Sequence, residues 1–215
     1  MSRRSGQSPQ QRIVALAGLV AIVGVGVLLL WAGGILGNQG GGEGIEDVAL
    51  FDPPRTGDQA DLDVGRSVGM LAPDFEISDF DGTRHRLSDF RGTTVYLNFW
   101  TTWCVPCQIE LPDIVALQEE FDDGLVVITV NRRESLNKAR TYFQNLPRLD
   151  GGTGVEFAVD GMDPDDTLYD EFVALKPSMP VSIVIDGDGV VRNVLNGLVR
   201  LEKMREAVNE ALAGA

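Results

Sequence analysis

A run of 24 residues without a charged side chain, 13–36, limits what this chain can fold into more than any other feature. A helix of this length spans roughly 36 Å, enough to cross the ~30 Å hydrocarbon core of a bilayer. Arg3, Arg4 and Arg12 precede the run, whereas the first charged residues after it are acidic. The positive-inside rule therefore predicts a single-pass, signal-anchor transmembrane helix in the cell membrane, with residues 1–12 in the cytoplasm and the rest of the chain extracytoplasmic.

A cleaved signal peptide is the alternative interpretation of this run. The apolar core of a signal peptide is usually about 7 to 15 residues long, and Ala32-Gly33-Gly34 is a weak cleavage site. We therefore expect the anchor to be retained. After it, residues 37–66 are glycine-rich at first and show no sustained apolar periodicity, which predicts a flexible linker. The short apolar stretch 48–51 could nevertheless pack on the folded domain.

The charge balance argues against nucleic acid as a partner. The chain has 215 residues with 32 acidic and 18 basic side chains, a net charge of -14, and no basic run longer than a pair such as Arg132-Arg133. Phosphate binding needs clustered Lys and Arg. Because the chain has one His and two Cys, a zinc site would have to borrow carboxylates, and at most one disulfide can form.

Alternating strand and helix patterns predict one α/β domain over residues 67–215. The run 93–100 is β-branched and aromatic without a strict period of two, which is typical of a strand buried on both faces of a sheet. Further patterns predict strands at 125–130, 181–186 and 190–195 and helices at 106–121, 134–146, 167–175 and 201–212. The turn Gly187-Asp188-Gly189 predicts that the last two strands form a hairpin. The order β-α-β-α, then β-β-α, predicts a mixed central sheet with helices on both faces.

Both cysteines fall in one tetrapeptide, Cys104-Val105-Pro106-Cys107, between the predicted strand 93–100 and the following helix. Unpaired N–H groups and the positive end of the dipole at a helix N-terminus lower the pKa of a thiol there, which makes it a nucleophile. The spacing places the second sulfur within bridging distance, so that it can attack a mixed disulfide formed by the first. The position of the pair therefore suits thiol-disulfide exchange.

A structural bridge and a metal site are the alternatives for Cys104 and Cys107. A loop this short gains only about 2 kcal/mol in the chain-entropy model, less than a long loop would. A zinc site lacks a second cysteine pair, and the single histidine, His85, lies on a polar stretch before the strand. The pattern favours a redox pair and leaves His85 as an ordinary surface residue.

Residues 98–107, Asn-Phe-Trp-Thr-Thr-Trp-Cys-Val-Pro-Cys, are followed by Glu110 and Pro112. This segment resembles the active site of the TlpA/ResA-like, membrane-anchored thiol-disulfide oxidoreductases. The likeness begins at 68–75, an opening segment that this family shares with peroxiredoxins, and extends to the strand 181–186. It implies a thioredoxin-like three-layer fold, an α/β architecture that here would follow the N-terminal transmembrane helix.

The resemblance implies a role for each residue near the pair. Cys104 matches the exposed nucleophile and Cys107 the buried resolving thiol. Trp103 matches an aromatic residue that binds substrate beside the nucleophile, or it simply packs. Thioredoxin has a buried Asp at the position of Asn98, and an amide cannot exchange a proton. Glu110 matches the family's proton-exchanging Glu; its alternative is a solvated carboxylate near the helix start.

Met179-Pro180, directly before the strand 181–186, resembles the family's cis-proline loop. A cis bond there implies that Met179 and Pro180 bind substrate, with backbone groups of Met179 pairing with a substrate strand beside Cys104. The alternative is an ordinary proline at the start of a strand. The family often has Thr before this Pro, so the bulky Met179 suggests a different substrate preference.

The implied function is reduction of extracytoplasmic protein disulfides by the Cys104-Cys107 dithiol, with Glu110 managing the proton of Cys107. The resemblance further implies electrons from a transmembrane thiol donor, substrates such as apocytochrome c in cytochrome c maturation, and no cofactor beyond the cysteine pair. The direction of electron flow depends on the reduction potential, so use as an oxidase stays open.

Two other functions remain as alternatives. Ala72-Pro73-Asp74-Phe75 suggests a peroxiredoxin-like peroxidase, although Leu97 stands where that family's pattern has a Pro. A Cu(I) chaperone could use Cys104, Cys107 and Met179 as soft ligands, without enzymatic turnover. Copper-carrying relatives of the fold usually space their cysteines differently and add a distant His.

Overall fold

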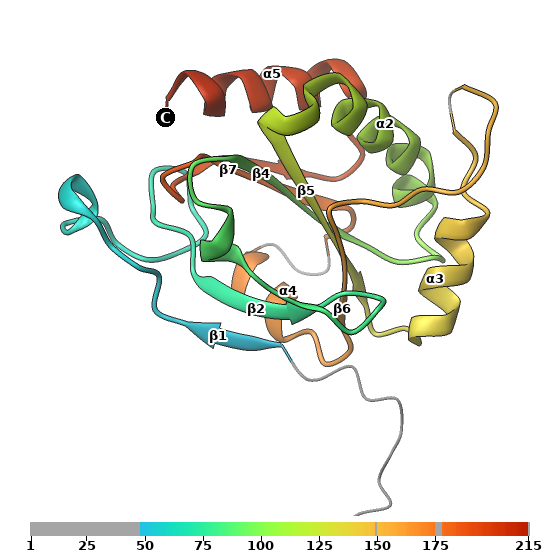
Figure 1. The fold of residues 1–215 in the computed structure, drawn as a ribbon, viewed down its shortest axis with the longest axis horizontal. Helices are drawn as coiled ribbons and strands as arrows, with labels where there is room; N and C mark the ends of the chain where they lie inside the picture. Colours follow the sequence, from blue (N-terminus) through green and yellow to red (C-terminus); the bar gives the residue numbers. More distant parts are fainter. Residues whose placement is uncertain (1–47, 149, 175–177, 215) are drawn as a thin grey trace, which may run out of the picture. The chain divides into compact units, whose positions relative to one another are not determined.

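A five-stranded mixed sheet forms the centre of the fold (Figure 1). The computed structural model describes residues 48–148, 150–174 and 178–214. The strand order is β6-β5-β4-β7-β8. β5 pairs in parallel with both β4 and β6, whereas β7 pairs antiparallel with both β4 and β8. The strands are β4 (Thr94–Trp100), β5 (Leu125–Arg132), β6 (Val159–Asp163), β7 (Val181–Ile185) and β8 (Val191–Asn196). The predicted mixed sheet is confirmed.

The central strand β4 is buried along its whole length. Tyr96 and Trp100 belong to the apolar cluster on one face of the sheet, and Leu97 and Phe99 to the cluster on the other. Because both faces are covered, hydrophobicity does not alternate along the strand. The buried polar residue Asn98 points to the same face as Tyr96 and Trp100, since side chains alternate along a strand.

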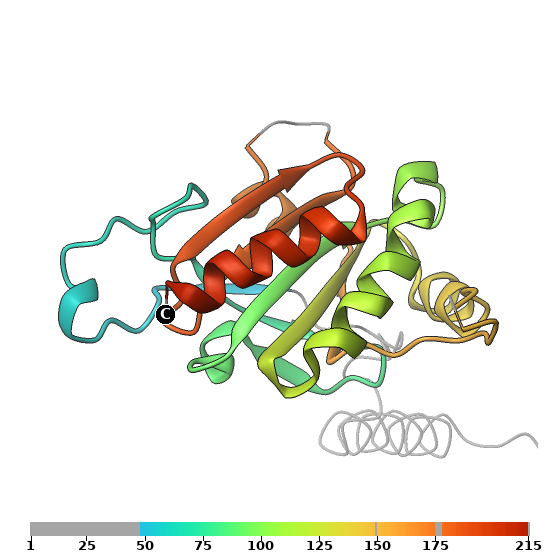
Figure 2. The same cartoon turned by 90° about the horizontal axis from the view of Figure 1, so that it is seen from above.

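Helices cover both faces of the sheet, as predicted. Figure 2 shows that α2 and α5 lie across the strands on one face, where α3 adds Ala139 and Phe143 to the same apolar cluster. The other face packs against α4 and a second, three-stranded sheet, β1-β2-β3. The bounds are α2 (Val105–Phe121), α3 (Leu136–Gln144), α4 (Thr167–Phe172), α5 (Leu201–Ala213), β1 (Ala49–Phe51), β2 (Asp74–Ser78) and β3 (Arg84–Arg86), with short 3-10 turns at Gly57–Gln59, Leu87–Phe90 and Asp122–Gly124.

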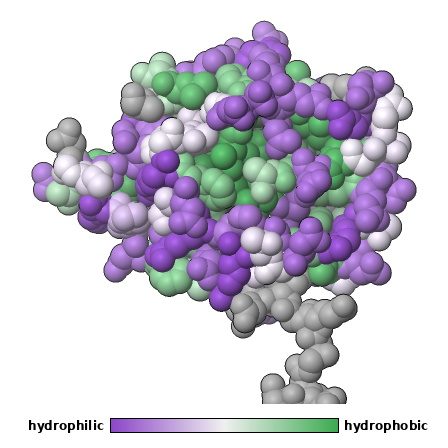
Figure 3. All heavy atoms as spheres, viewed as in Figure 1, coloured by the Kyte–Doolittle hydropathy of each residue, from purple (hydrophilic) through white to green (hydrophobic). Residues whose placement is uncertain are grey.

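One face of the molecule carries an apolar area between the layers. In Figure 3, apolar side chains gather in the middle of the face seen in Figure 1, between α2 and α5 above and β2 below, and hydrophilic side chains surround them. The hairpin between β7 and β8 turns at Gly189, whose φ of 85° is a conformation that glycine adopts without strain. The predicted hairpin is therefore present.

Some elements differ from the sequence expectations. The helix expected at 134–146 begins at Leu136, and the helix expected at 167–175 ends at Phe172. The strands β1, β2, β3 and β6 were not expected, because they are short or carry charged residues. Part of the predicted linker is also packed: Val48 is buried and β1 pairs with β2.

The predicted anchor 13–36 and the predicted cytoplasmic residues 1–12 lie outside the described residues. Among the residues that the structure describes, no helix is long and apolar enough to cross a membrane. Transmembrane anchoring therefore stays a prediction from the sequence.

Candidate active site

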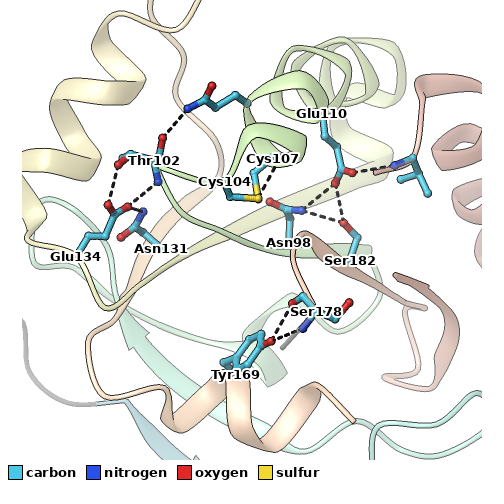
Figure 4. Close-up of a disulfide and its surroundings, with 12 residues drawn as sticks. Asn98, Thr102, Cys104, Cys107, Glu110, Asn131, Glu134, Tyr169, Ser178 and Ser182 are labelled. Carbon is cyan, nitrogen blue, oxygen red and sulfur yellow. Dashed lines mark hydrogen bonds between the residues drawn. A yellow bond between two sulfur atoms is a disulfide. The ribbon is translucent and has the colours of Figure 1, made fainter. Parts of the chain in front are cut away.

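Cys104 and Cys107 form a disulfide at the start of α2 (Figure 4), with an S–S distance of 2.06 Å. Cys104 is the N-cap residue of the helix, and its Sγ accepts a hydrogen bond from the Cys107 N–H at 3.2 Å. An N–H group of the first helical turn thus points at the first sulfur, where it would stabilise negative charge. The resemblance implied an exposed nucleophile, but in the disulfide form Cys104 is only 5% exposed and Cys107 is 1% exposed. Both cysteines are therefore buried, and Cys104 is slightly the more accessible of the two.

Exposed apolar side chains flank the disulfide in the sequence. Trp103 is 65% exposed and Val105 is 60% exposed, and Ile109, one turn further along α2, is also exposed. The packing alternative for Trp103 is therefore wrong, because its ring lies outside the core. An exposed aromatic residue beside a reactive sulfur can contact a bound peptide.

Glu110 is buried behind the disulfide. It lies one helical turn after Cys107, is 1% exposed, and accepts hydrogen bonds from Asn98 Nδ2 (3.1 Å), Ser182 Oγ (3.3 Å) and the Val199 N–H (3.0 Å). Burial raises the pKa of Glu110 to about 7, although these hydrogen bonds lower it. Glu110 is therefore not a solvated carboxylate, and near neutral pH it can either hold or accept a proton.

Two neighbouring strands supply the side-chain partners of Glu110. Asn98 on β4 and Ser182 on β7 are paired in the sheet register, and Asn98 Nδ2 also donates to Ser182 Oγ at 2.9 Å. Figure 4 shows Asn98 between the disulfide and Glu110. Burial and the nearby charge of Glu110 raise the pKa of Tyr96, which keeps this phenol neutral. The site thus combines a sulfur pair with one titratable carboxyl group.

A second carboxylate holds the loop that precedes Cys104. Glu134 accepts hydrogen bonds from the Thr102 N–H and the Thr102 hydroxyl, both at 2.7 Å, and from Asn131 Nδ2 at 2.9 Å. Gln108 Nε2 donates to the Thr102 carbonyl at 2.6 Å. Burial alone would raise the pKa of Glu134, but the bonds from Lys138, Thr102 and Asn131 lower it below its usual range. Glu134 therefore stays ionised and fixes the loop. The sequence did not predict this role, because Glu134 was expected to lie in a helix.

The loop before β7 lies at the same end of the sheet. The Met179-Pro180 bond is cis, as predicted, and Pro180 is buried whereas Met179 is half-buried. Val181 pairs with Phe99 near the end of β4, and Met179 packs against the apolar cluster that contains both cysteines. By contrast, His85 lies on β3 and pairs with Asp79 at 2.8 Å, so it is not part of this site.

Comparison with known proteins gives a consistent family assignment. The model described as AhpC/TSA family matches residues 68–194. The thiol-disulfide oxidoreductase ResA of Geobacillus thermodenitrificans (strain NG80-2) is 31% identical over 141 residues, which cover 65% of this chain and 75% of that protein. ResA of Bacillus subtilis (strain 168) is 31% identical over 144 residues, covering 66% and 75% of the two chains.

Solved structures share the fold. A putative thiol:disulfide interchange protein DsbE from Chlorobium tepidum is 29% identical, with a TM-score of 0.57, and the match covers 68% of this chain and 98% of that one. A putative protein disulfide isomerase from Bacteroides thetaiotaomicron is 26% identical with a TM-score of 0.57, covering 71% and 95% of the two chains. The predicted thioredoxin-like fold is confirmed.

Proposed function

Because the chain belongs to the AhpC/TSA family and is a thiol-disulfide oxidoreductase of the ResA type, we propose that it reduces disulfides of extracytoplasmic proteins while anchored in the cell membrane. The proposal rests on one observation above all: Glu110, one helical turn after the resolving cysteine, is buried, and burial raises its pKa to about 7. A purely structural disulfide has no need of a buried proton acceptor.

The exchange proceeds in two steps. The Cys104 thiolate attacks one sulfur of the substrate disulfide, so that a mixed disulfide forms and the other substrate sulfur leaves as a thiolate that takes up a proton. The Cys107 thiolate then attacks Cys104 and releases the second substrate sulfur. Two electrons pass from the enzyme dithiol to the substrate, which becomes a dithiol, and the enzyme ends as the Cys104-Cys107 disulfide.

The second step needs Cys107 to lose its proton inside the protein, where burial disfavours a thiolate. Glu110 is the group placed to accept this proton, since it lies on the same side of α2 one turn away. Its carboxylate is held by Asn98, Ser182 and the Val199 N–H. After the step, the proton can pass to solvent or to the released substrate sulfur.

The membrane tether is proposed from the sequence. The uncharged run 13–36 and the arginines before it support an anchor with the redox domain outside the cytoplasm. Disulfides persist in that compartment, so a reductase there needs electrons from a transmembrane thiol donor. Resemblance suggests apocytochrome c as one substrate, and the cysteine pair needs no further cofactor.

Thiol trapping in intact cells tests the direction of electron flow. Acid quenching followed by alkylation should find the Cys104-Cys107 pair mostly reduced. A sample reduced before alkylation marks the position of the dithiol form, and a Cys104→Ser, Cys107→Ser double variant marks the form that takes up no label. A mostly oxidised pair would contradict the reductase and favour an oxidase. Protease added to spheroplasts should digest residues 67–215, whereas protection of this region would contradict the proposed topology.

The AhpC/TSA match keeps a peroxidase as the second candidate. Against it, Leu97 occupies the position of that family's Pro and lies fully buried inside β4. Rapid consumption of hydrogen peroxide by the purified chain would support the peroxidase. Reduction of a protein disulfide without peroxide turnover would exclude it, and tight Cu(I) binding without any disulfide exchange would instead support the chaperone alternative.

A further inference from the structure

The hydroxyl group of Tyr169 binds both backbone groups of Ser178, the residue before Met179. Tyr169 Oη donates to the Ser178 carbonyl at 2.8 Å and accepts from the Ser178 N–H at 3.1 Å. Figure 4 shows the tyrosine reaching from α4 to this loop, on the opposite side of the strands from Glu110. One side chain therefore satisfies a donor and an acceptor on the loop that leads into Pro180.

Tyr169 is itself held from three directions. Its side chain is buried, and its ring meets the Phe99 ring edge to face at 5.7 Å. The guanidinium carbon of Arg132, at the end of β5, lies 3.1 Å from the centre of the Tyr169 ring, a cation-π arrangement. The Tyr169 N–H also donates to Asp163 Oδ2 at 2.8 Å. Because these contacts fix the ring, the Tyr169 hydroxyl can hold the loop at Ser178 in one position.

Arg132 is in turn fixed by a carboxylate. Its Nε and Nη2 atoms donate to Asp166 at 2.9 and 2.8 Å, and both side chains are largely buried. Such a two-pronged arginine-carboxylate pair has a defined orientation. The contacts therefore run continuously from β5, which pairs with the strand β4 that precedes the disulfide, through α4 to the loop at Ser178.

We infer that Tyr169 is a positioning residue for substrate binding, which holds the backbone of the Ser178–Pro180 loop against the site of Cys104. The inference rests on the proposed function, because it assumes that a substrate peptide pairs with Met179. A displaced loop misaligns the substrate disulfide with the Cys104 sulfur, and thiol attack depends on that alignment. Tyr169 belongs to the apolar cluster on the face of the sheet away from the cysteines, so it acts through the loop.

Tyr169→Phe is the direct test, since it removes the hydroxyl and leaves the ring for Arg132 and Phe99. With a disulfide-cyclised peptide as substrate, we expect kcat/KM to fall about tenfold, mainly through a higher KM, as loss of one or two hydrogen bonds implies. With hydroxyethyl disulfide, which has no peptide backbone, the rate should stay at the wild-type value. Tyr142→Phe is the matched control, because the structure gives its hydroxyl no hydrogen-bond partner among the described residues.

Amide hydrogen exchange supplies a readout that does not depend on the reaction. The Ser178 N–H should exchange about tenfold faster in Tyr169→Phe than in the wild type and the Tyr142→Phe control. Equal losses with both substrates would mean a general structural role, and unchanged peptide kinetics would mean that the hydroxyl is dispensable; either result overturns the inference. If the wild type reduces neither substrate, the proposed function fails, whereas exchange at Ser178 still decides whether Tyr169 holds the loop.

Discussion

Replacing Glu110 with Gln removes a carboxyl group that the fold holds close to half-protonated at neutral pH. Burial raises its pKa from 4.5 to about 7, so ionisation costs roughly 3 kcal/mol more in the folded protein than in water. This cost already includes the opposing effect of the hydrogen bonds from Val199, Ser182 and Asn98. Glutamine has nearly the same shape, but it cannot accept the proton of Cys107.

The substitution should slow the step in which Cys107 displaces the substrate from Cys104. General base catalysis contributes about 10² to 10⁴-fold, so we expect resolution of the mixed disulfide to be at least about 100-fold slower at pH 7. In the wild type the rate should rise with pH as Glu110 ionises and level off above its pKa of about 7. In Glu110→Gln this inflection should be absent.

Rapid mixing of the reduced protein with a peptide disulfide, followed by acid quenching and mass spectrometry, measures this step. The mixed disulfide should accumulate in Glu110→Gln, while alkylation of Cys104 keeps its wild-type rate. Asp160→Asn is the matched control: burial raises the pKa of Asp160 to about 7 as well, but this residue lies in β6, two strands away from β4. Unchanged resolution and an unchanged pH profile in Glu110→Gln would refute the role of Glu110.

Three further predictions concern stability and binding. The free energy of unfolding should fall as pH rises from about 4 to 7, because Asp160 binds its proton more tightly in the folded state. Urea titrations should show that this fall is about 2–4 kcal/mol smaller in Asp160→Asn than in the wild type. An equal fall in the two proteins would contradict the effect. Trp103→Ala should raise KM for a peptide disulfide and change the free energy of unfolding by less than about 0.5 kcal/mol, because the side chain is exposed. Trp100→Ala removes a buried ring stacked on Phe143 and should lower the free energy of unfolding by about 3–5 kcal/mol. Similar thermal denaturation of the two variants would contradict this difference. Glu134→Ala should destabilise the fold by about 1–3 kcal/mol and speed amide exchange in the loop before Cys104, and a silent substitution would mean that the loop does not need this carboxylate.

Apolar runs made the central elements predictable from the sequence. β4 and β5 are rich in buried apolar residues, so hydrophobicity alone located them. α2 was expected from apolar residues such as Leu111 and Ile114, although its buried residues also include Glu110 and Asp113. The strand β6 escaped prediction because its sequence is Val-Asp-Gly-Met-Asp. Its glycine allows β2 to approach, since a Cβ at Gly161 would lie 2.6 Å from Ile77 Cδ1.

The candidate site was predictable only in part, for a related reason. The positions of Cys104, Cys107 and Pro180 follow from a local motif. The buried polar contacts depend on residues far apart in the chain, such as Tyr169 with the Ser178 backbone and Glu134 with Thr102. A charged or aromatic residue in a helix pattern gives no sign of such a partner until the strands are placed side by side.

The central claim is that, once the disulfide is reduced, Cys104 is an activated thiol that a substrate can reach and Cys107 is a protected thiol behind it. Alkylation of the fully reduced chain at pH 7, followed by peptide mapping, measures both rates directly. We expect Cys104 to react at least about tenfold faster than a free cysteine and Cys107 to react far more slowly than a free cysteine. Two sulfurs that both react at the rate of free cysteine would contradict it.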